Sequence, residues 1–226
     1  MMAGFNVWVA MLVAFLAGMA AGWVTSVFHT KLRIPAILAG ILTQLGLWSV
    51  NLAIMGMKAN QALNVNNFDL LVNLRYLQEV GKGTRPFYQH PILVVGLFTV
   101  VVVAILYWFF GTELGSALRA TGYNEYMIRA LGVDTNKMKL LALMIANGLV
   151  SLSGALVCQH QKYADINMGR GAIVIGLAAI VIGEVLFSKA INFGLKLSSV
   201  VVGAVVYFLI RAIVLDFGLN TNDMNL

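Results

Sequence analysis

Long apolar runs separated by short polar segments make up most of the chain. Runs of this length suit helices that cross a bilayer core about 30 Å thick, because an α-helix rises about 1.5 Å per residue. The pattern predicts an all-α, polytopic transmembrane bundle with spans at about 5–28, 36–56, 91–110, 140–158, 172–187 and 197–216. The fifth run is short for a span, which predicts a tilted, re-entrant or broken helix.

Small residues mark places where helices can approach closely. Gly18 and Gly22 form a GxxxG pair in the first span. The fourth span contains the small residues Gly148, Ser151 and Gly154. Lipid offers no hydrophobic drive between helices, so close backbone packing has to hold a bundle together. We expect these residues to lie at contacts; the alternative is that they reflect only the abundance of glycine in membrane helices.

Composition agrees with a membrane protein and excludes several other classes. The chain is 60% hydrophobic and 11% charged, and its net charge of +6 is scattered between apolar runs, so no nucleic-acid partner is expected. A lone cysteine and three distant histidines predict no metal ion or cofactor. The sequence has no GxxxxGK[ST] loop and no catalytic set, so it is not expected to be an enzyme, and ATP hydrolysis would need another chain.

The basic residues give a modest indication of orientation. With the loop after the first span in the cytoplasm, eight basic residues fall on that side and six on the other. This orientation places the N-terminus outside without an export signal. Together with the polar ending GLNTNDMNL, it predicts a fragment of a longer protein, incomplete at one or both ends.

One polar stretch, LRATGYNEYMIRALGVDTNKMK, is rich in helix-capping residues. Asn124 can cap a two-turn helix, and Glu125 complements its positive end. Gly132 can end that helix in the left-handed conformation. Arg129 lies four residues after Glu125, at the spacing of a surface ion pair. Asp134 or the next residue can then cap the following span.

The predicted short helix carries an apolar face formed by Tyr123, Met127, Ala130 and Leu131. A helix of about eight residues is unstable alone in water, so it needs a partner. One alternative is that it lies on lipid headgroups. The other is that it docks in a groove of a cytoplasmic protein, with Met127 and Leu131 as anchors.

A longer run carries a family resemblance, through ALRATGYNEYMIRALGV, then SGAL, then QKYADINMGRG and GLAAIVIGE. It resembles the inner-membrane permease subunits of bacterial ABC importers, in the branch that includes branched-chain amino acid, ribose and nucleoside permeases. It is most similar to a subgroup paired with a lipoprotein binding subunit for tryptophan, tyrosine or similar amino acids. The upstream segment HTKLRIPAILAGILTQLGLWSVNLAIMG also resembles this subgroup.

The resemblance implies a multi-pass permease of the bacterial inner membrane that forms half of a pathway for a small polar solute. It implies three partners: a second permease subunit, a cytoplasmic ATP-binding subunit and an extracytoplasmic substrate-binding protein. Residues 1–226 would be one permease domain, with a coupling loop at about 111–139. By position, the coupling helix and its flanks would comprise Tyr123, Asn124, Glu125, Met127, Ile128, Arg129, Leu131 and Gly132. An amino acid is the implied cargo, with branched-chain, aromatic and nucleoside substrates all open.

Polar residues in or beside the spans are candidates for the pathway or for hydrogen bonds between helices, because a buried amide in hydrocarbon needs a partner. They are Gln44, Asn51, Asn147, Gln159 and Glu184. Interhelical hydrogen bonding is favoured for the amides. For Glu184 a structural role is favoured over proton coupling, because no basic partner lies in its span.

The loop QHQKYADINMGRG, with Asp165 and Arg170, is expected outside, where a binding protein or substrate could contact it; an ordinary solvated loop is the alternative. Two other functions compete with the importer. A secondary transporter should show paired intramembrane charges or repeated broken helices. A structural membrane protein without transport would leave the short helix on the lipid surface.

Overall fold

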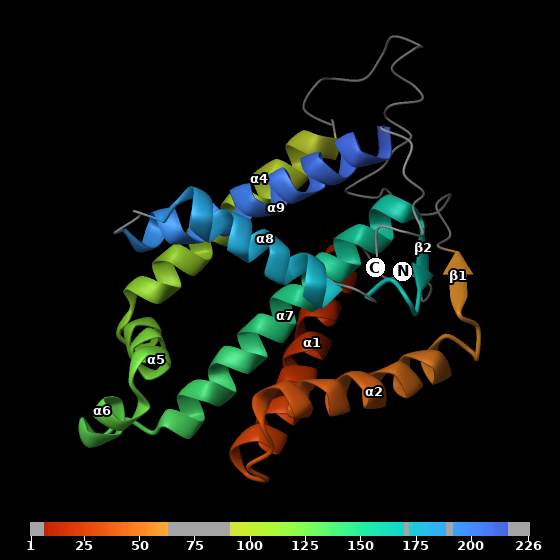
Figure 1. Ribbon diagram of the computed structural model, residues 1–226. Coiled ribbons are helices and arrows are strands. Elements are labelled where there is room, and N and C mark those ends of the chain that lie inside the picture. The colour runs from red at the N-terminus through yellow and green to blue at the C-terminus, as the bar shows by residue number, and fades with distance from the viewer. Residues whose placement is uncertain (1–6, 63–90, 170–171, 189–191, 217–226) are drawn as a thin grey trace. The chain divides into compact units, whose positions relative to one another are not determined.

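The computed structural model describes residues 7–62, 91–169, 172–188 and 192–216 (Figure 1). Nearly all of the regular structure in these residues is helical, which confirms the predicted all-α class. The helices are α1 (Val7–Thr30), α2 (Ala36–Ile54), α4 (Pro91–Gly111), α5 (Glu113–Tyr123), α6 (Glu125–Ala130), α7 (Thr135–Gln161), α8 (Ala172–Leu186) and α9 (Phe193–Asp216), and the strands are β1 (Asn60–Ala62) and β2 (Tyr163–Asp165).

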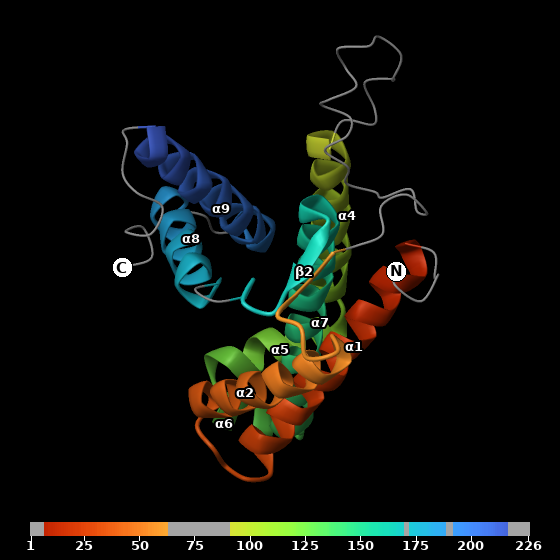
Figure 2. The ribbon, with the colours of Figure 1, turned by 90° about the vertical axis from the view of Figure 1, so that its right-hand side faces the viewer.

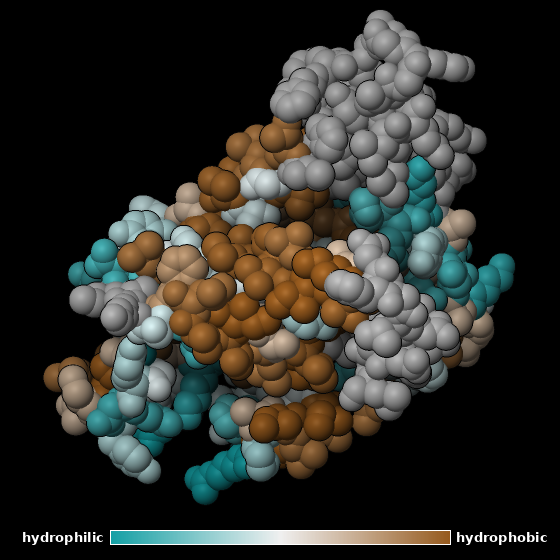
Figure 3. Space-filling model, turned by 45° about the horizontal axis from the view of Figure 1, so that its top comes forward, coloured by the Kyte–Doolittle hydropathy of each residue, from teal (hydrophilic) through white to brown (hydrophobic). Residues whose placement is uncertain are grey.

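Five of these helices, α1, α2, α4, α7 and α9, are long and apolar enough to cross a membrane. Apolar residues cover much of the surface in the space-filling view (Figure 3). The remaining predicted span, α8, has 15 residues, or roughly 22 Å of helix, so the prediction of a short fifth helix is confirmed. Helix α7 is longer than predicted because the capped residues before 140 continue it without a break.

The chain divides into two compact units, each described by itself. One contains α1, α2, α5, α6, α7 and both strands, and the other contains α8, α9 and residues 101–108 of α4. In the second unit α8 and α9 pack closely (Figure 2). Gly183 lies against the carbonyl of Ser199, and Gly203 lies against that of Ala179, so any larger side chain would force these backbones apart.

In the first unit, α1 and α7 lie side by side and form the main contact (Figures 1 and 2). A Cβ atom placed on Gly18 would lie 2.5 Å from the Cβ of Ser151, and one on Gly22 would collide with the carbonyl oxygen of Leu143. The hydroxyl of Ser151 donates to the carbonyl of Ala14 across the interface, over 2.7 Å. The predicted close contact at the GxxxG pair is therefore confirmed.

Two short strands join segments that are far apart in sequence. β1, after α2, pairs antiparallel with β2, after α7, with Asn60 opposite Asp165. The pairing was not predicted, because strands of three residues leave no periodic signal. The strand pairing brings the segments after α2 and after α7 together at one end of the first unit. The end of α1 and the start of α7 line a common pocket at the opposite end. This agrees with the alternating sides expected for these loops.

The α1–α7 contact predicts that Gly22→Ala destabilises the protein by about 1–3 kcal/mol, because the added methyl meets backbone atoms that cannot move aside. Gly40→Ala is the matched control, since a Cβ there has no neighbour within 4 Å. The control should be neutral or stabilising by up to about 1 kcal/mol. Unfolding of the purified protein in mixed micelles measures both variants, and equal stabilities would contradict the close contact.

Candidate functional site

The predicted short helix exists and is capped as expected. The side-chain oxygen of Asn124 accepts a hydrogen bond from the backbone N–H of Met127 at 3.0 Å and begins α6. Gly132 follows the helix with φ of +86°, in the region that glycine occupies without steric cost. Asp134 then caps α7 by accepting from the backbone N–H of Asn136 at 3.0 Å. With six residues, α6 is somewhat shorter than predicted.

A second helix, α5, precedes α6 and was missed by the sequence analysis. Its first turn is capped by the hydroxyl of Thr112, which accepts from the backbone N–H of Gly115 at 3.3 Å. Glu113 lies in that first turn, where a carboxylate complements the helix dipole. The sequence signal for the start of α5 was Thr112, a capping residue, followed by Glu113. This pair comes directly after the aromatic residues that end the preceding apolar run.

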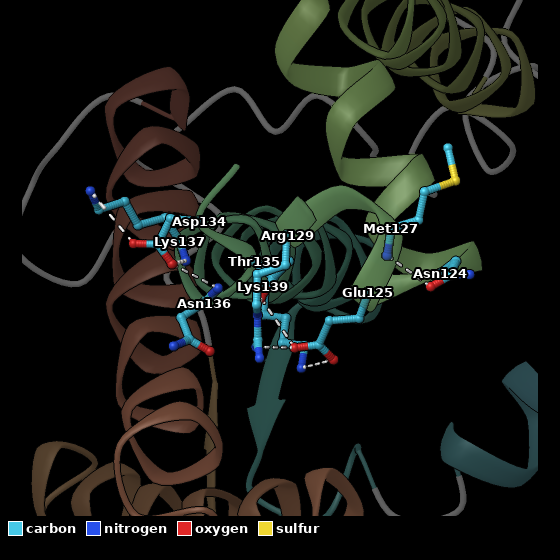
Figure 4. A network of polar contacts seen from close by, with 9 residues as sticks. All are labelled: Asn124, Glu125, Met127, Arg129, Asp134, Thr135, Asn136, Lys137 and Lys139. Atoms are coloured by element: carbon cyan, nitrogen blue, oxygen red, sulfur yellow. Dashed lines mark hydrogen bonds and ion pairs between the residues drawn. The ribbon is translucent and has the colours of Figure 1, made fainter. Parts of the chain in front are cut away.

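The carboxylate of Glu125 is the centre of a polar network between α6 and α7 (Figure 4). The predicted ion pair with Arg129 is confirmed, with Nη2 donating to Oε1 at 2.6 Å. Lys139 Nζ donates to Oε2 at 2.7 Å, and the Thr135 hydroxyl donates to Oε1 at 3.1 Å. The Arg129 guanidinium also donates to the Thr135 hydroxyl, at 2.9 Å from Nη2. Thr135, which is only 1% exposed, therefore links both charged groups.

This network keeps Glu125 ionised. The hydrogen bond from Lys139 is the largest cause that lowers the pKa of Glu125; the Thr135 hydroxyl and the Arg129 charge lower it further, against the opposing effect of desolvation. A carboxyl with a lowered pKa in the folded state stabilises the fold at pH values above its unfolded pKa, and this contribution is lost as pH falls through the folded pKa. At neutral pH, α6 is thus held to the first turns of α7.

The apolar side chains of α6 face both inward and outward. Ile128 is buried, whereas Met127 and Leu131 are 59% and 68% exposed. Met127 points away from the Glu125 carboxylate (Figure 4). Tyr126, at 83% exposed, also lies on the surface of α6 and was missed by the sequence analysis, which followed only the i, i+4 spacing. Exposed Tyr and Met side chains on a short helix form an apolar surface of the kind that lipid headgroups or another protein can cover.

An open pocket of about 480 Å³ lies beside the same network. It joins the end of α1 and the turn after it to α6 and the start of α7. Its lining residues are His29, Thr30, Arg33, Glu125, Arg129, Asn136 and Lys139. The position of the 31–35 turn beside α6 was not predicted, because about 90 residues of chain separate the two segments.

The structure does not gather the predicted span residues into one site. Asn147 donates to the carbonyl of Leu143 in its own helix, at 2.8 Å, and its side chain makes no hydrogen bond to another helix among the described residues. Gln44, Asn51 and Glu184 are exposed on their helices.

Gln159 is 1% exposed, and neither of its side-chain polar atoms has a hydrogen-bond partner in the part of the chain that the structure describes. Asp165 lies in β2, on the side of the first unit away from α6. Arg170, predicted to share its loop, lies outside the described residues. No group of three or more His, Cys, Asp or Glu side chains suited to a metal ion occurs among the described residues.

Comparison with known proteins places these features in context. A family model described as "Branched-chain amino acid transport system / permease component" matches residues 1–226. A tyrosine transport system permease protein of Clostridioides difficile (strain R20291) is 36% identical over 223 residues, which cover 99% of this chain and 70% of the relative. An uncharacterised protein of Rickettsia prowazekii (strain Madrid E) is 32% identical, over 98% of this chain and 75% of the relative.

A more distant relative is the autoinducer 2 import system permease protein LsrC of Yersinia pestis (strain Pestoides F). It is 28% identical over 81% of this chain and 48% of its own length. No solved structure matches the chain.

The Glu125 network predicts that Thr135→Val destabilises the protein by about 1–3 kcal/mol, because the isosteric change removes a buried hydroxyl that both donates and accepts. Thr99→Val is the control, since the Thr99 hydroxyl is exposed and bonds only within its own helix. Unfolding in mixed micelles measures both. A Thr135→Val protein as stable as the control would show that the Thr135 hydroxyl contributes nothing to stability.

Proposed function

The chain belongs to the family of branched-chain amino acid transport system permease components, and we propose that it imports an amino acid, with α6 as the helix that docks on a separate ATPase. Family membership makes it a permease subunit of an ABC importer and a multi-pass protein of the bacterial inner membrane. This decides against the secondary transporter and the structural membrane protein.

In this family the permease does not hydrolyse ATP; a separate ATPase subunit does so, and a binding protein supplies the solute. For this chain we propose a cytoplasmic ATP-binding subunit, an extracytoplasmic binding protein and a second copy of the permease as partners. The observation that carries the amino acid proposal is the 36% identity to a tyrosine permease along 99% of the chain. An aromatic amino acid is accordingly the first substrate to test.

Exposure supports α6 as the docking helix. Met127 in α6 and Leu131, the residue at its C-terminal cap, have exposed side chains. The cap at Asn124 and the turn at Gly132 hold this short helix in place. Exposed apolar anchors on a short, fixed helix suit a groove on a partner protein. Tyr123 and Tyr126 would add aromatic contact area beside them.

The hydrogen bonds at Glu125 connect α6 to α7, so a displacement of α6 can be passed to α7. If the ATPase shifts α6, the bonds from Glu125 to Thr135 and Lys139 carry that shift to the first turns of α7. Close packing at Gly18 and Gly22 then carries it from α7 to α1. Each link is a direct contact, and chains of such contacts can carry coupling between distant sites.

The other predicted site residues keep their proposed roles. Gln159, buried and without a partner in the described residues, is the strongest candidate for a polar contact with substrate or with the second permease copy. Gln44, Asn51, Asn147 and Glu184 stay candidates for the pathway or for polar contacts between helices. On the opposite side from α6, Asp165 in β2 is a candidate contact for the binding protein.

Transport can be tested directly. Proteoliposomes that contain this permease with its ATPase, loaded with ATP and given the binding protein outside, should accumulate labelled tyrosine. Unlabelled phenylalanine should compete more effectively than ribose, because a pocket for an aromatic amino acid excludes a sugar. Uptake of ribose in preference to tyrosine would contradict the amino acid proposal, whereas uptake without ATPase or ATP would contradict the importer mechanism.

Docking by α6 predicts that the double variant Met127→Asp, Leu131→Asp no longer co-purifies with the ATPase, because two carboxylates cannot enter an apolar groove without losing hydration. Leu32→Asp is the control: Leu32 is 60% exposed, lies on the same side of the first unit, and is outside α6. It should retain the ATPase. Retention by the double variant, with normal membrane insertion, would show that α6 is not the docking helix.

A further inference from the structure

We propose that the pocket between the end of α1 and the α6–α7 junction binds the phosphate group of an anionic phospholipid, in the leaflet on whose side α6 lies. The pocket shares Glu125 and Arg129 with α6, but Met127 and Leu131, the proposed ATPase anchors, do not line it. The proposal rests on the charge of the pocket, on its fixed walls and on its position at the ends of two spans.

The pocket has an excess of positive charge. Arg33, Arg129 and Lys139 face one carboxylate, that of Glu125, which leaves a formal charge of +2 with His29 counted as neutral. The network already satisfies the Glu125 oxygens. In the part of the chain that the structure describes, the guanidinium of Arg33 has no ion pair or hydrogen bond, and neither has the side-chain amide of Asn136. Both side chains are exposed to solvent, so a phosphate that displaces water can accept charge-assisted hydrogen bonds from them.

The wall that carries Arg33 is fixed by the fold. The ring nitrogen Nδ1 of His29 lies 2.9 Å from the carbonyl oxygen of Ile34, and the backbone N–H of Ile34 donates to the carbonyl of Phe28. These bonds close the turn, in which Arg33 adopts φ of +55°. A non-glycine residue in that conformation is uncommon, and here it gives Arg33 a set position at the pocket.

Position favours a lipid as the source of the phosphate. Thr30 ends one helix of membrane-spanning length, and Thr135 begins another; both ends border the pocket region. Phospholipid headgroups lie at this boundary, and basic pockets between helix ends on the cytoplasmic side are suited to them. Met127, the proposed ATPase anchor, points away from the Glu125 carboxylate, which lines the pocket (Figure 4).

Lipid binding is tested on the full chain in detergent by native mass spectrometry, with phosphatidylglycerol or phosphatidylcholine added. We expect one retained phosphatidylglycerol and weaker retention of phosphatidylcholine. Arg33→Gln should lower phosphatidylglycerol affinity by about fivefold, the factor that one basic side chain contributes at an anionic lipid surface. Lys31→Gln is the matched control, because Lys31 is exposed in the same turn but does not line the pocket; it should leave the affinity unchanged.

Several outcomes would overturn the proposal. Equal losses in the two glutamine variants would mean a general attraction between basic residues and anionic lipid. Equal retention of the two lipids would mean no charge selection. Displacement of phosphatidylglycerol by millimolar inorganic phosphate would assign the site to a soluble anion. Arg33→Lys is a second variant that separates loss of charge from misfolding, because it keeps the positive charge. It should retain most of the phosphatidylglycerol binding. A loss as large as that of Arg33→Gln would contradict a site based on charge.

Discussion

Close approach of two backbones, at the contact of α1 with α7, is the interaction on which the first unit depends. A membrane helix gains little from burying apolar side chains, because lipid is as apolar as they are. Packing must therefore come from surfaces that fit without a gap, and Gly18 and Gly22 create such a surface by having no side chain. The hydroxyl of Ser151 adds a hydrogen bond across the same seam. Everything attached to α7, including the polar network at its start, is positioned by this contact.

The short helix α6 is stabilised by different means, because it lies beyond the long apolar helices and is too short to be stable alone. Its ends are closed by a cap and a glycine turn, Ile128 is buried beneath it, and Glu125 is bonded to α7. Its other apolar side chains, among them Met127 at 59% exposed, face solvent. These are the side chains that we propose contact the ATPase.

Local signals in the sequence predicted the long helices, the cap at Asn124, the turn at Gly132 and the ion pair with Arg129, because hydropathy and short spacings determine all of these. Partners that are distant in sequence could not be predicted in this way. Lys139 meets Glu125 only because α7 turns back beside α6, and Arg33 reaches the same place only through the packing of α1 on α7. The separate helix α5 was missed because its capping signal follows an apolar run without a polar break.

The pairing of β1 with β2 has a mechanical consequence for α7. This helix has 27 residues, a rod about 40 Å long. One end is bonded to α6 through Glu125, and the other leads within two residues into a strand hydrogen-bonded to the segment after α2. These two attachments restrain rotation of α7 about its long axis. If α6 docks on the ATPase as proposed, a push there reaches one end of α7 while the paired strands hold the other end.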